Sequence, residues 1–267
     1  MVYDLPHTTL SRTGLRVTRF GIGGAYCESV AGYQAALDCG VNYVDTARSY
    51  RDGADEEVIG QAIQGRRHEL ILATKTAQRD AEGARRDLET SLRLLGADYL
   101  DILQLHHLNT AADREKALGP RGALEAIRKA REEGLVRFIG VTGHDWAQLA
   151  PAIDTGLFDT VLCWYNCAMK EPEEAVFPIA LAHDMGVIIM NASRNEKLLE
   201  GPDAPKEAGL ERIPLTAELD LFGLAYERFF PEIFKAERGQ YFTPRPLVEL
   251  MADLVGVRPG ERVLDPT

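Results

Sequence analysis

Short apolar runs alternate with amphipathic stretches along roughly the first 190 residues of the chain. Runs of this length, bounded by glycine or polar residues, are typical of buried strands, whereas apolar residues spaced three and four apart indicate helices. The pattern predicts strands at about residues 19–24, 41–44, 70–74, 100–105, 137–141, 160–165 and 187–190. It predicts helices at about residues 30–39, 55–63, 81–94, 122–133, 146–154 and 175–183.

Local signals sharpen two of these boundaries and add a hairpin. Residues 8–17 contain two short strand-like pieces around Arg12, Thr13 and Gly14, which favours a hairpin that caps one end of the fold. Gly40 is placed to end the first helix. Asp55 is placed to cap the second helix with its carboxylate, and the acidic residues after it suit the positive end of the helix dipole.

Strands that alternate with helices at this cadence indicate parallel βα units with right-handed crossovers. We therefore expect an α/β protein with a (β/α)8 TIM-type barrel. Seven strands are recognisable and an eighth is not, so the barrel is predicted to be incomplete, with a helical segment appended at its C-terminal side.

Three polar residues stand at the downstream ends of consecutive predicted strands. Asp45, Lys75 and His106 each follow an apolar run, and Tyr50 lies in the loop after the first of these runs. In a parallel barrel the carboxyl ends of the strands meet on one face, where (β/α)8 enzymes carry their chemistry. The four side chains are therefore expected to form one site.

These residue types suit proton transfer to a carbonyl oxygen. A tyrosine keeps its proton at neutral pH because its reference pKa is near 10. A lysine ammonium nearby favours the tyrosinate and lowers that pKa, and an aspartate fixes the ammonium in place. Tyr50 then works as a general acid. A neutral His106 can orient the carbonyl by donating a hydrogen bond, while a bound cofactor supplies a hydride.

The same residues resemble a known family. Asp45-Thr46-Ala47-x-x-Tyr50, Gly53-x-Asp55-Glu56-Glu57, Ala73-Thr74-Lys75-Thr76 and Leu105-His106 are similar to the aldo-keto reductases in type, order and spacing, over about residues 8–200. The resemblance implies that Tyr50 is the proton donor, Lys75 and Asp45 its tuning pair, and His106 the carbonyl-orienting residue. It also implies reduction of an aldehyde or ketone with NADP(H), or less often NAD(H), bound without a Rossmann domain.

The cofactor positions match this family less closely. Thr142 keeps the hydroxyl of the family's Gly-Val-Ser-Asn segment, whereas Gly143 cannot replace its amide. Met190 or Asn191 stands where many members stack a tyrosine on the nicotinamide. Gly23 and Gly24 serve either close approach of the cofactor or tight packing. The implied cofactor-binding residues are Gly23, Gly24, Thr142, Asn166 and Asn191.

A different resemblance begins after residue 200. Residues 201–216 read as a linker or junction rich in proline and glycine. Residues 217–267 resemble the N-terminal part of the N6-adenine DNA methyltransferases of type I restriction-modification systems, on the segments Asp220-Leu221-Phe222-Gly223 and Gly239-Gln240-Tyr241-Phe242-Thr243-Pro244. Neither the glycine-rich S-adenosylmethionine loop nor the target-adenine motif follows, so we do not expect methyl transfer by this chain alone. S-adenosylmethionine would bind only if this part were complete.

The composition of the chain limits the classes of partner that it is expected to bind. The formal charge is −11 at pH 7 in 267 residues, and residues 217–267 carry nine acidic against six basic side chains, which gives no electrostatic footprint for nucleic acid. No run reaches the ~20 apolar residues that a membrane span needs. The four cysteines follow no paired metal-ligand spacing and are interpreted as reduced, mostly buried thiols; no metal is predicted. We expect a cytoplasmic protein that acts on a small-molecule carbonyl substrate, of undetermined identity and oligomeric state.

Two hypotheses follow. The first is an NADP(H)-dependent oxidoreductase of the aldo-keto reductase type. The second is a non-catalytic fusion or truncated fragment that carries part of a DNA methyltransferase; a real fusion and a reading-frame artefact both stay open. Arg262-Val263-Leu264 is a candidate for a substitute eighth strand.

Overall fold

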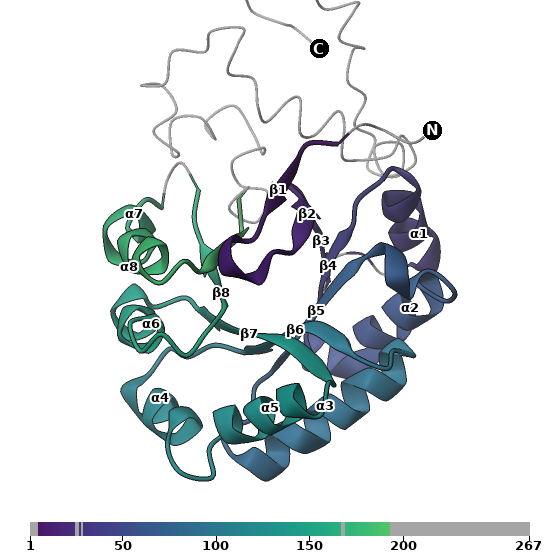
Figure 1. Ribbon diagram of the computed structural model, residues 1–267. Coiled ribbons are helices and arrows are strands. Elements are labelled where there is room, and N and C mark those ends of the chain that lie inside the picture. Colours follow the sequence, from purple (N-terminus) through teal and green to yellow (C-terminus); the bar gives the residue numbers. More distant parts are fainter. Residues whose placement is uncertain (1–4, 25–26, 28, 167–168, 193–267) are drawn as a thin grey trace, which may run out of the picture. The chain divides into compact units, whose positions relative to one another are not determined.

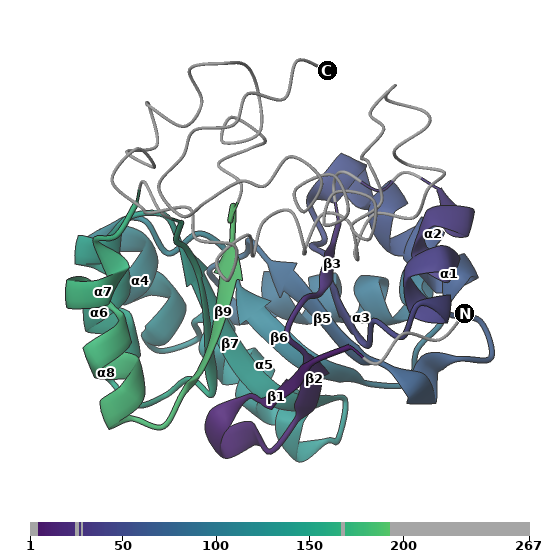
Figure 2. The same ribbon diagram turned by 90° about the horizontal axis from the view of Figure 1, so that it is seen from above.

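Seven parallel strands form one curled sheet, the larger part of a barrel wall (Figures 1 and 2). The computed structural model describes residues 5–24, 27, 29–166 and 169–192. The sheet order follows the sequence and every neighbouring pair is parallel. Its strands are β3 (Ile22–Gly23), β4 (Tyr43–Asp45), β5 (Ile71–Thr76), β6 (Leu100–Leu105), β7 (Val136–Gly143), β8 (Thr160–Trp164) and β9 (Gly186–Met190).

Helices connect consecutive strands and ring the outside of the sheet (Figure 1). The α-helices are α1 (Val30–Asp38), α2 (Ala54–Ala62), α3 (Ala81–Leu95), α4 (Ala111–Leu118), α5 (Ala123–Glu132), α6 (Trp146–Ile153), α7 (Pro172–Ala175) and α8 (Phe177–Ala182). The described residues also contain three short 3-10 helices, η1 (Ser11–Thr13), η2 (Tyr50–Gly53) and η3 (Arg67–Glu69). Over the residues that the structure describes, this arrangement confirms the predicted α/β barrel of parallel strands.

The longest helix shows how local sequence sets these elements. Asp80 precedes α3 in extended conformation and its carboxylate accepts a hydrogen bond from the Gly83 amide, which satisfies one of the free N–H groups of the first turn. Gly96 ends the helix at a φ of 59°, a left-handed conformation that glycine adopts without strain. Leu88 and Leu95, seven residues apart on one face of α3, are fully buried, which is the pattern of an amphipathic helix.

Several predicted boundaries differ from the structure. The strand expected at residues 19–24 is confined to β3, the helix expected at 175–183 is divided into α7 and α8, and α4 was not predicted. The predicted cap at Asp55 is wrong, because α2 begins at Ala54 after Gly53 and has no side-chain cap. Gly53, with a φ of 95°, makes the turn by itself and leaves the Asp55 carboxylate for buried polar contacts.

The predicted hairpin is confirmed and lies at the amino ends of the barrel strands. It consists of β1 (His7–Thr9) and β2 (Arg16–Thr18), paired antiparallel on either side of η1. Its apolar residues Leu10, Leu15 and Val17 form one core cluster with strand residues of the barrel, namely Tyr43 of β4, Ala73 of β5 and Ile102 of β6. The hairpin therefore closes the end of the barrel opposite to the ends where Asp45, Lys75 and His106 stand.

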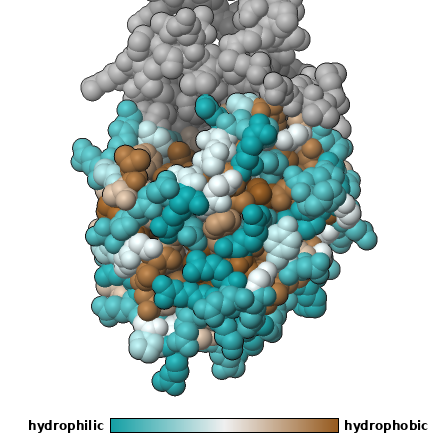
Figure 3. All heavy atoms as spheres, in the orientation of Figure 1, coloured by the Kyte–Doolittle hydropathy of each residue, from teal (hydrophilic) through white to brown (hydrophobic). Residues whose placement is uncertain are grey.

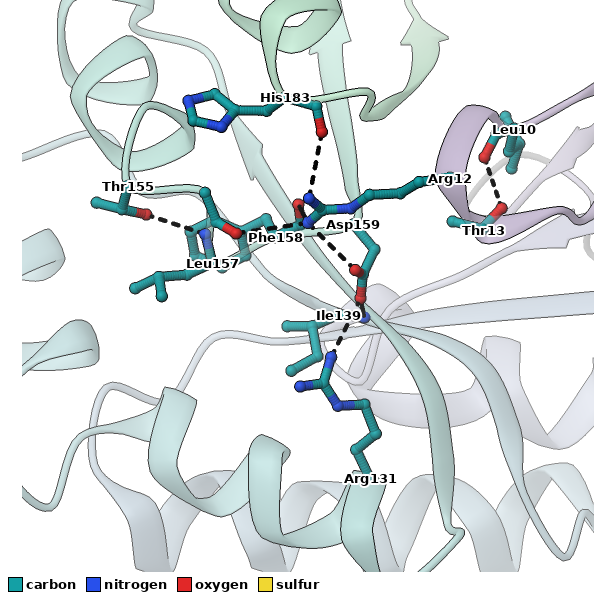
Figure 4. Close-up of polar contacts among 11 residues, drawn as sticks. Leu10, Arg12, Thr13, Arg131, Ile139, Thr155, Leu157, Phe158, Asp159 and His183 are labelled. Atoms are coloured by element: carbon teal, nitrogen blue, oxygen red, sulfur yellow. Dashed lines mark hydrogen bonds and ion pairs between the residues drawn. The ribbon is translucent and has the colours of Figure 1, made fainter.

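Arg12 fastens this hairpin to the start of β8 (Figure 4). Its guanidinium lies 3.2 Å from the Asp159 carboxylate and donates hydrogen bonds to the carbonyl oxygens of Phe158 and of His183, the latter at 3.2 Å. Asp159 also accepts a hydrogen bond from the Ile139 amide at 2.8 Å and so joins β7 to the same cluster. One arginine thus links the hairpin to three neighbouring segments of the barrel.

The face of the described part that Figure 3 shows carries both hydrophilic and hydrophobic side chains. Figure 3 shows hydrophilic side chains over most of the rim of the described part, with smaller hydrophobic patches between them. No helix among the described residues is both long and apolar enough to cross a bilayer. Cys27, Cys39 and Cys163 are free thiols, and Cys27 and Cys163 are buried, as predicted. Cys167, the junction at 201–216, residues 217–267 and the candidate strand at 262–264 lie outside the described residues.

We predict that Arg12→Ala lowers the free energy of unfolding by about 1–2 kcal/mol, because it removes partly exposed charge-assisted contacts to the barrel. Urea denaturation measures this change. Arg16→Ala, an exposed arginine on the same hairpin, is the control and should change stability by less than about 0.5 kcal/mol. Equal unfolding midpoints for the two variants would contradict the role given to Arg12.

Candidate active site

The carboxyl ends of β4, β5 and β6 bring together the polar residues that the sequence singled out. Asp45 closes β4, Lys75 is the penultimate residue of β5, and His106 follows β6 directly. Because the strands are parallel and adjacent, these positions share one end of the barrel. Lys75 is 1% exposed and His106 3%, so the site is assembled from buried polar groups.

The Lys75 ammonium is the centre of the cluster. It donates to Asp45 Oδ2, to the Thr46 carbonyl oxygen at 2.7 Å and to the Tyr50 hydroxyl oxygen at 3.4 Å. An ammonium has three N–H donors, and each of them has an acceptor here. Because Lys75 donates to the tyrosine oxygen, the tyrosine keeps its own O–H proton for another acceptor.

A left-handed turn holds Tyr50 in place. Arg51 and Asp52, which follow it, have φ angles of 49° and 55°, and Gly53 has 95°. Residues other than glycine adopt positive φ angles only at a cost in conformational energy, so contacts around the turn must stabilise it. Arg48 supplies two of them, to Glu56 and, at 2.9 Å, to the Asp52 carbonyl oxygen. Arg48 also occupies the space that a Cβ at Gly53 would need.

Two buried carboxylates anchor that turn to the barrel. Asp55 accepts hydrogen bonds from Arg51 at 2.8 Å, from Tyr33 at 3.1 Å and from Thr46. Glu56 pairs with Arg48 and accepts a hydrogen bond from Thr74 at 2.7 Å. Both carboxylates are fully buried, and both are paired with an arginine, as buried charge requires.

Burial and charge act in opposite directions on the acid groups of the site. Burial raises the pKa of Tyr50 above its usual value, and the positive charge of Lys75 opposes that rise. The pKa of Asp45 is likewise raised by burial and lowered by Lys75 and Gln104. Lys75 thus acts on Tyr50 in the predicted direction, but burial outweighs it and the predicted net lowering of the tyrosine pKa is absent.

His106 lies beside Tyr50 as an uncharged ring. The two ring centroids are 5.8 Å apart in an edge-on arrangement. Burial, reinforced by the charge of Lys75, lowers the pKa of His106 from 6.5 to about 2. The imidazole is therefore neutral at physiological pH, as predicted. Its Nδ1 atom is buried and has no hydrogen-bond partner among the described residues.

Further aromatic rings continue from His106 across the ends of β7 and β8. His107 stacks on His106 with centroids 3.7 Å apart, His144 lies edge-on to His107 at 4.5 Å, and Trp164 stacks on His144 at 4.2 Å. Burial also lowers the pKa of His107, to about 4, and that of His144. The sequence did not predict this row, because adjacent strand ends bring its members together.

The predicted cofactor positions fall into three groups. Thr142 is buried, and its hydroxyl oxygen accepts a hydrogen bond from the His107 amide at 3.1 Å. The Asn166 amide donates to the Asn191 carbonyl oxygen at 3.0 Å, so these two residues are adjacent. A Cβ at Gly24 would collide with Asp55, whereas a Cβ at Gly23 would meet open space. Packing explains Gly24, whereas no close contact requires a glycine at position 23.

Sequence reasoning missed one polar residue of this site. Gln104 lies two residues before His106 on β6, is fully buried, and donates from Nε2 to Asp45 Oδ1 at 2.7 Å. The alternation of strand side chains was a signal, because residues two apart point to the same face. Neither the spacing nor the family resemblance had marked this glutamine.

Comparison with known proteins agrees with this geometry. The profile of the aldo/keto reductase family matches residues 25–208, and that of the N-6 DNA Methylase family matches residues 217–267. The aldo-keto reductase YhdN of Bacillus subtilis is 32% identical over 199 residues, which cover 66% of this chain and 58% of that protein. The methylglyoxal reductase YeaE of Escherichia coli is 34% identical over 122 residues, which cover 45% and 40%.

Solved structures share the fold. An aldo-keto reductase from Bacillus halodurans in its holo form superposes with a TM-score of 0.67 at 25% identity, covering 74% of this chain and 70% of that chain. An aldo/keto reductase from Klebsiella pneumoniae in complex with NADP and acetate gives 0.61 at 28% identity, covering 83% and 76%. Because the family profile matches more than half of its length, the chain belongs to the aldo/keto reductase family.

Proposed function

We propose that the chain reduces a small aldehyde or ketone with NADP(H), using Tyr50 as the proton donor. The observation that carries the proposal is the Lys75 ammonium, which is held by Asp45 and donates to the Tyr50 oxygen. That arrangement stabilises a tyrosinate and leaves the tyrosine proton for a carbonyl oxygen. Proton transfer of this kind contributes about 10²- to 10⁴-fold to a rate.

The other residues have supporting roles in this proposal. His106, neutral and next to Tyr50, orients the carbonyl oxygen by donating a hydrogen bond. Asp45 pairs with the Lys75 ammonium and holds it in place. Together they direct the substrate oxygen toward Tyr50, where negative charge develops as the carbonyl is reduced.

The cofactor would supply a hydride to the carbonyl carbon. Thr142, Asn166 and Asn191 would hold its nicotinamide end, and Gly23 would allow its close approach. The Thr142 hydroxyl fits this role because it can donate a hydrogen bond while it accepts one from His107. The Klebsiella relative was solved with NADP, which supports NADP(H) as the cofactor.

The names of relatives suggest a substrate class. Relatives named as methylglyoxal reductases include proteins of Escherichia coli, Yersinia pestis and Salmonella typhimurium, which are 32–34% identical to this chain over 122 to 130 residues. Methylglyoxal is a small α-oxoaldehyde whose carbonyl carbon is readily attacked. We propose small activated carbonyl compounds of this type as the first substrates to test.

A second candidate function rests on the N-6 DNA Methylase match at residues 217–267. In this alternative the chain is a fusion of parts of two families whose barrel has no catalytic activity. Such a fusion is not expected to bind NADP(H). NADPH titration separates the two, with Trp146 and Trp164 fluorescence as the signal. Micromolar binding supports the reductase, whereas a folded chain that does not bind millimolar NADPH would overturn it.

We predict that Tyr50→Phe lowers kcat for methylglyoxal reduction by about 10²- to 10⁴-fold and leaves NADPH affinity unchanged, because only the transferable proton is lost. NADPH oxidation at 340 nm measures the rate. Tyr99→Phe is the matched control, since Tyr99 lies under Arg67 just before β6, at the other end of the strand. Loss of activity in both variants would argue against a specific role for Tyr50.

The neutral state of His106 predicts a pH-dependent stability. Its folded pKa of about 2 lies below the ordinary 6.5, so between these values the unfolded chain binds a proton that the folded chain does not. Stability therefore falls as the pH falls from 7 to 5. We predict that this decrease is smaller by about 2 kcal/mol in His106→Gln. Urea denaturation at pH 7 and pH 5 measures it, and equal decreases in the two proteins would show that His106 is not held neutral.

A further inference from the structure

We propose that Gln104 is a positioning residue for the proton-donor site, because its amide holds the Asp45 carboxylate in the orientation that anchors Lys75. The inference rests on the proposed function and deepens it. Among the described residues the side chain of Gln104 makes a hydrogen bond to Asp45 and none to Lys75 or Tyr50, so it acts on them through Asp45.

The two oxygens of Asp45 have separate donors. Oδ1 accepts from Gln104 Nε2 at 2.7 Å, and Oδ2 accepts from Lys75 Nζ. A carboxylate held by one donor can rotate and exchange its oxygens, whereas two donors from neighbouring strands fix its plane. Hydrogen bonds therefore connect Gln104 to Asp45, Asp45 to Lys75, and Lys75 to the proposed proton donor Tyr50.

The amide orientation is set by chemistry. If the side-chain oxygen of Gln104 faced Asp45, it would oppose a carboxylate, so the NH₂ group must point to Asp45. The oxygen Oε1 is then buried and has no hydrogen-bond partner among the described residues. An unpaired buried acceptor costs stability. Ile102, two residues earlier on the same face of β6, is apolar and fully buried, so an apolar residue at 104 would avoid this cost, and the contact with Asp45 is what the amide gains.

The barrel makes room for this side chain. Lys75, Gln104, Gly140 and Thr160 are consecutive partners across β5, β6, β7 and β8. A Cβ at Gly140 would lie 2.8 Å from Gln104 Cγ and 2.6 Å from Thr160 Oγ1, which is closer than real contacts allow. Glycine at 140 therefore permits the glutamine to lie inside the barrel with its amide directed to Asp45.

The charged groups around Asp45 decide in which direction its pKa changes when the Gln104 amide is lost. Lys75, Tyr50, Tyr43 and Asp55 are the titratable groups that act on it. Burial raises the pKa of Asp45, and the hydrogen bond from Gln104 works with Lys75 against that rise. Without the amide, Asp45 takes up a proton at higher pH and no longer anchors the ammonium below that pH.

The test is Gln104→Met in the full chain, which keeps the size of the side chain and removes its donor and its unpaired acceptor. Thr160→Val is the matched control, because Thr160 is also fully buried and its hydroxyl has no partner among the described residues. Folding is verified by thermal unfolding. Gly140→Ala is a second variant that displaces Gln104 without changing it.

In Gln104→Met we predict that the titration midpoint of the Asp45 carboxyl rises by about one pH unit. The midpoint is measured by ¹³C NMR of aspartate-labelled protein. The kcat for methylglyoxal should fall about 10- to 100-fold, and the acidic limb of its pH profile should move to higher pH. The NADPH affinity should stay within about twofold of that of the parent protein. Gly140→Ala should change both quantities in the same direction, and Thr160→Val neither.

Two results would separate failure of this inference from failure of the proposed function. An unchanged Asp45 midpoint and an unchanged kcat profile in folded Gln104→Met would overturn the role of Gln104 and leave the reductase standing. A parent chain without turnover would overturn the reductase. The carboxyl titration would then still decide whether Gln104 holds Asp45.

Discussion

The buried ion pair between Lys75 and Asp45 is the interaction on which the site depends. A charged lysine inside a barrel loses most of its hydration, and the loss is tolerated only when the charge is paired and every N–H has an acceptor. Asp45, Thr46 and Tyr50 meet that condition. These groups replace the water molecules that the buried ammonium has lost. The Tyr50 oxygen is one of the three acceptors, so the need to satisfy every N–H of Lys75 also places the ammonium against the tyrosine oxygen.

The same rule organises the layer around the ion pair. Asp55 and Glu56 are fully buried acids, and their arginine partners, Arg51 and Arg48, come from the turn that carries Tyr50. Backbone strain at Arg51 and Asp52 is thus held by charge pairing. Tyr50 thus stands on a turn that two ion pairs hold in place, which suits the proposed role of proton donor.

The histidines show what burial does to a group that titrates near neutral pH. His106 and His107 stack on each other beside Lys75, and a proton on either would meet both low polarity and like charge. Uncharged imidazoles can donate and accept hydrogen bonds, and they do not compete with Lys75 for Asp45. His106, His107 and Lys75 all lie in the part of the chain, residues 25–208, that matches the aldo/keto reductase family.

How much of this could be predicted differs between features. Periodicity and strand-end position were enough for the seven strands, most helices and the quartet of Asp45, Tyr50, Lys75 and His106, because these signals are local and the parallel barrel converts strand ends into one site. Gln104, the row from His107 to Trp164 and the buried partners of Asp55 depended on the tertiary structure. Contacts such as that of Gln104 with Asp45, 59 residues apart, are set by strand register and packing. The net pKa of Tyr50 was decided there too, because burial, which a sequence does not display, outweighs the charge of Lys75.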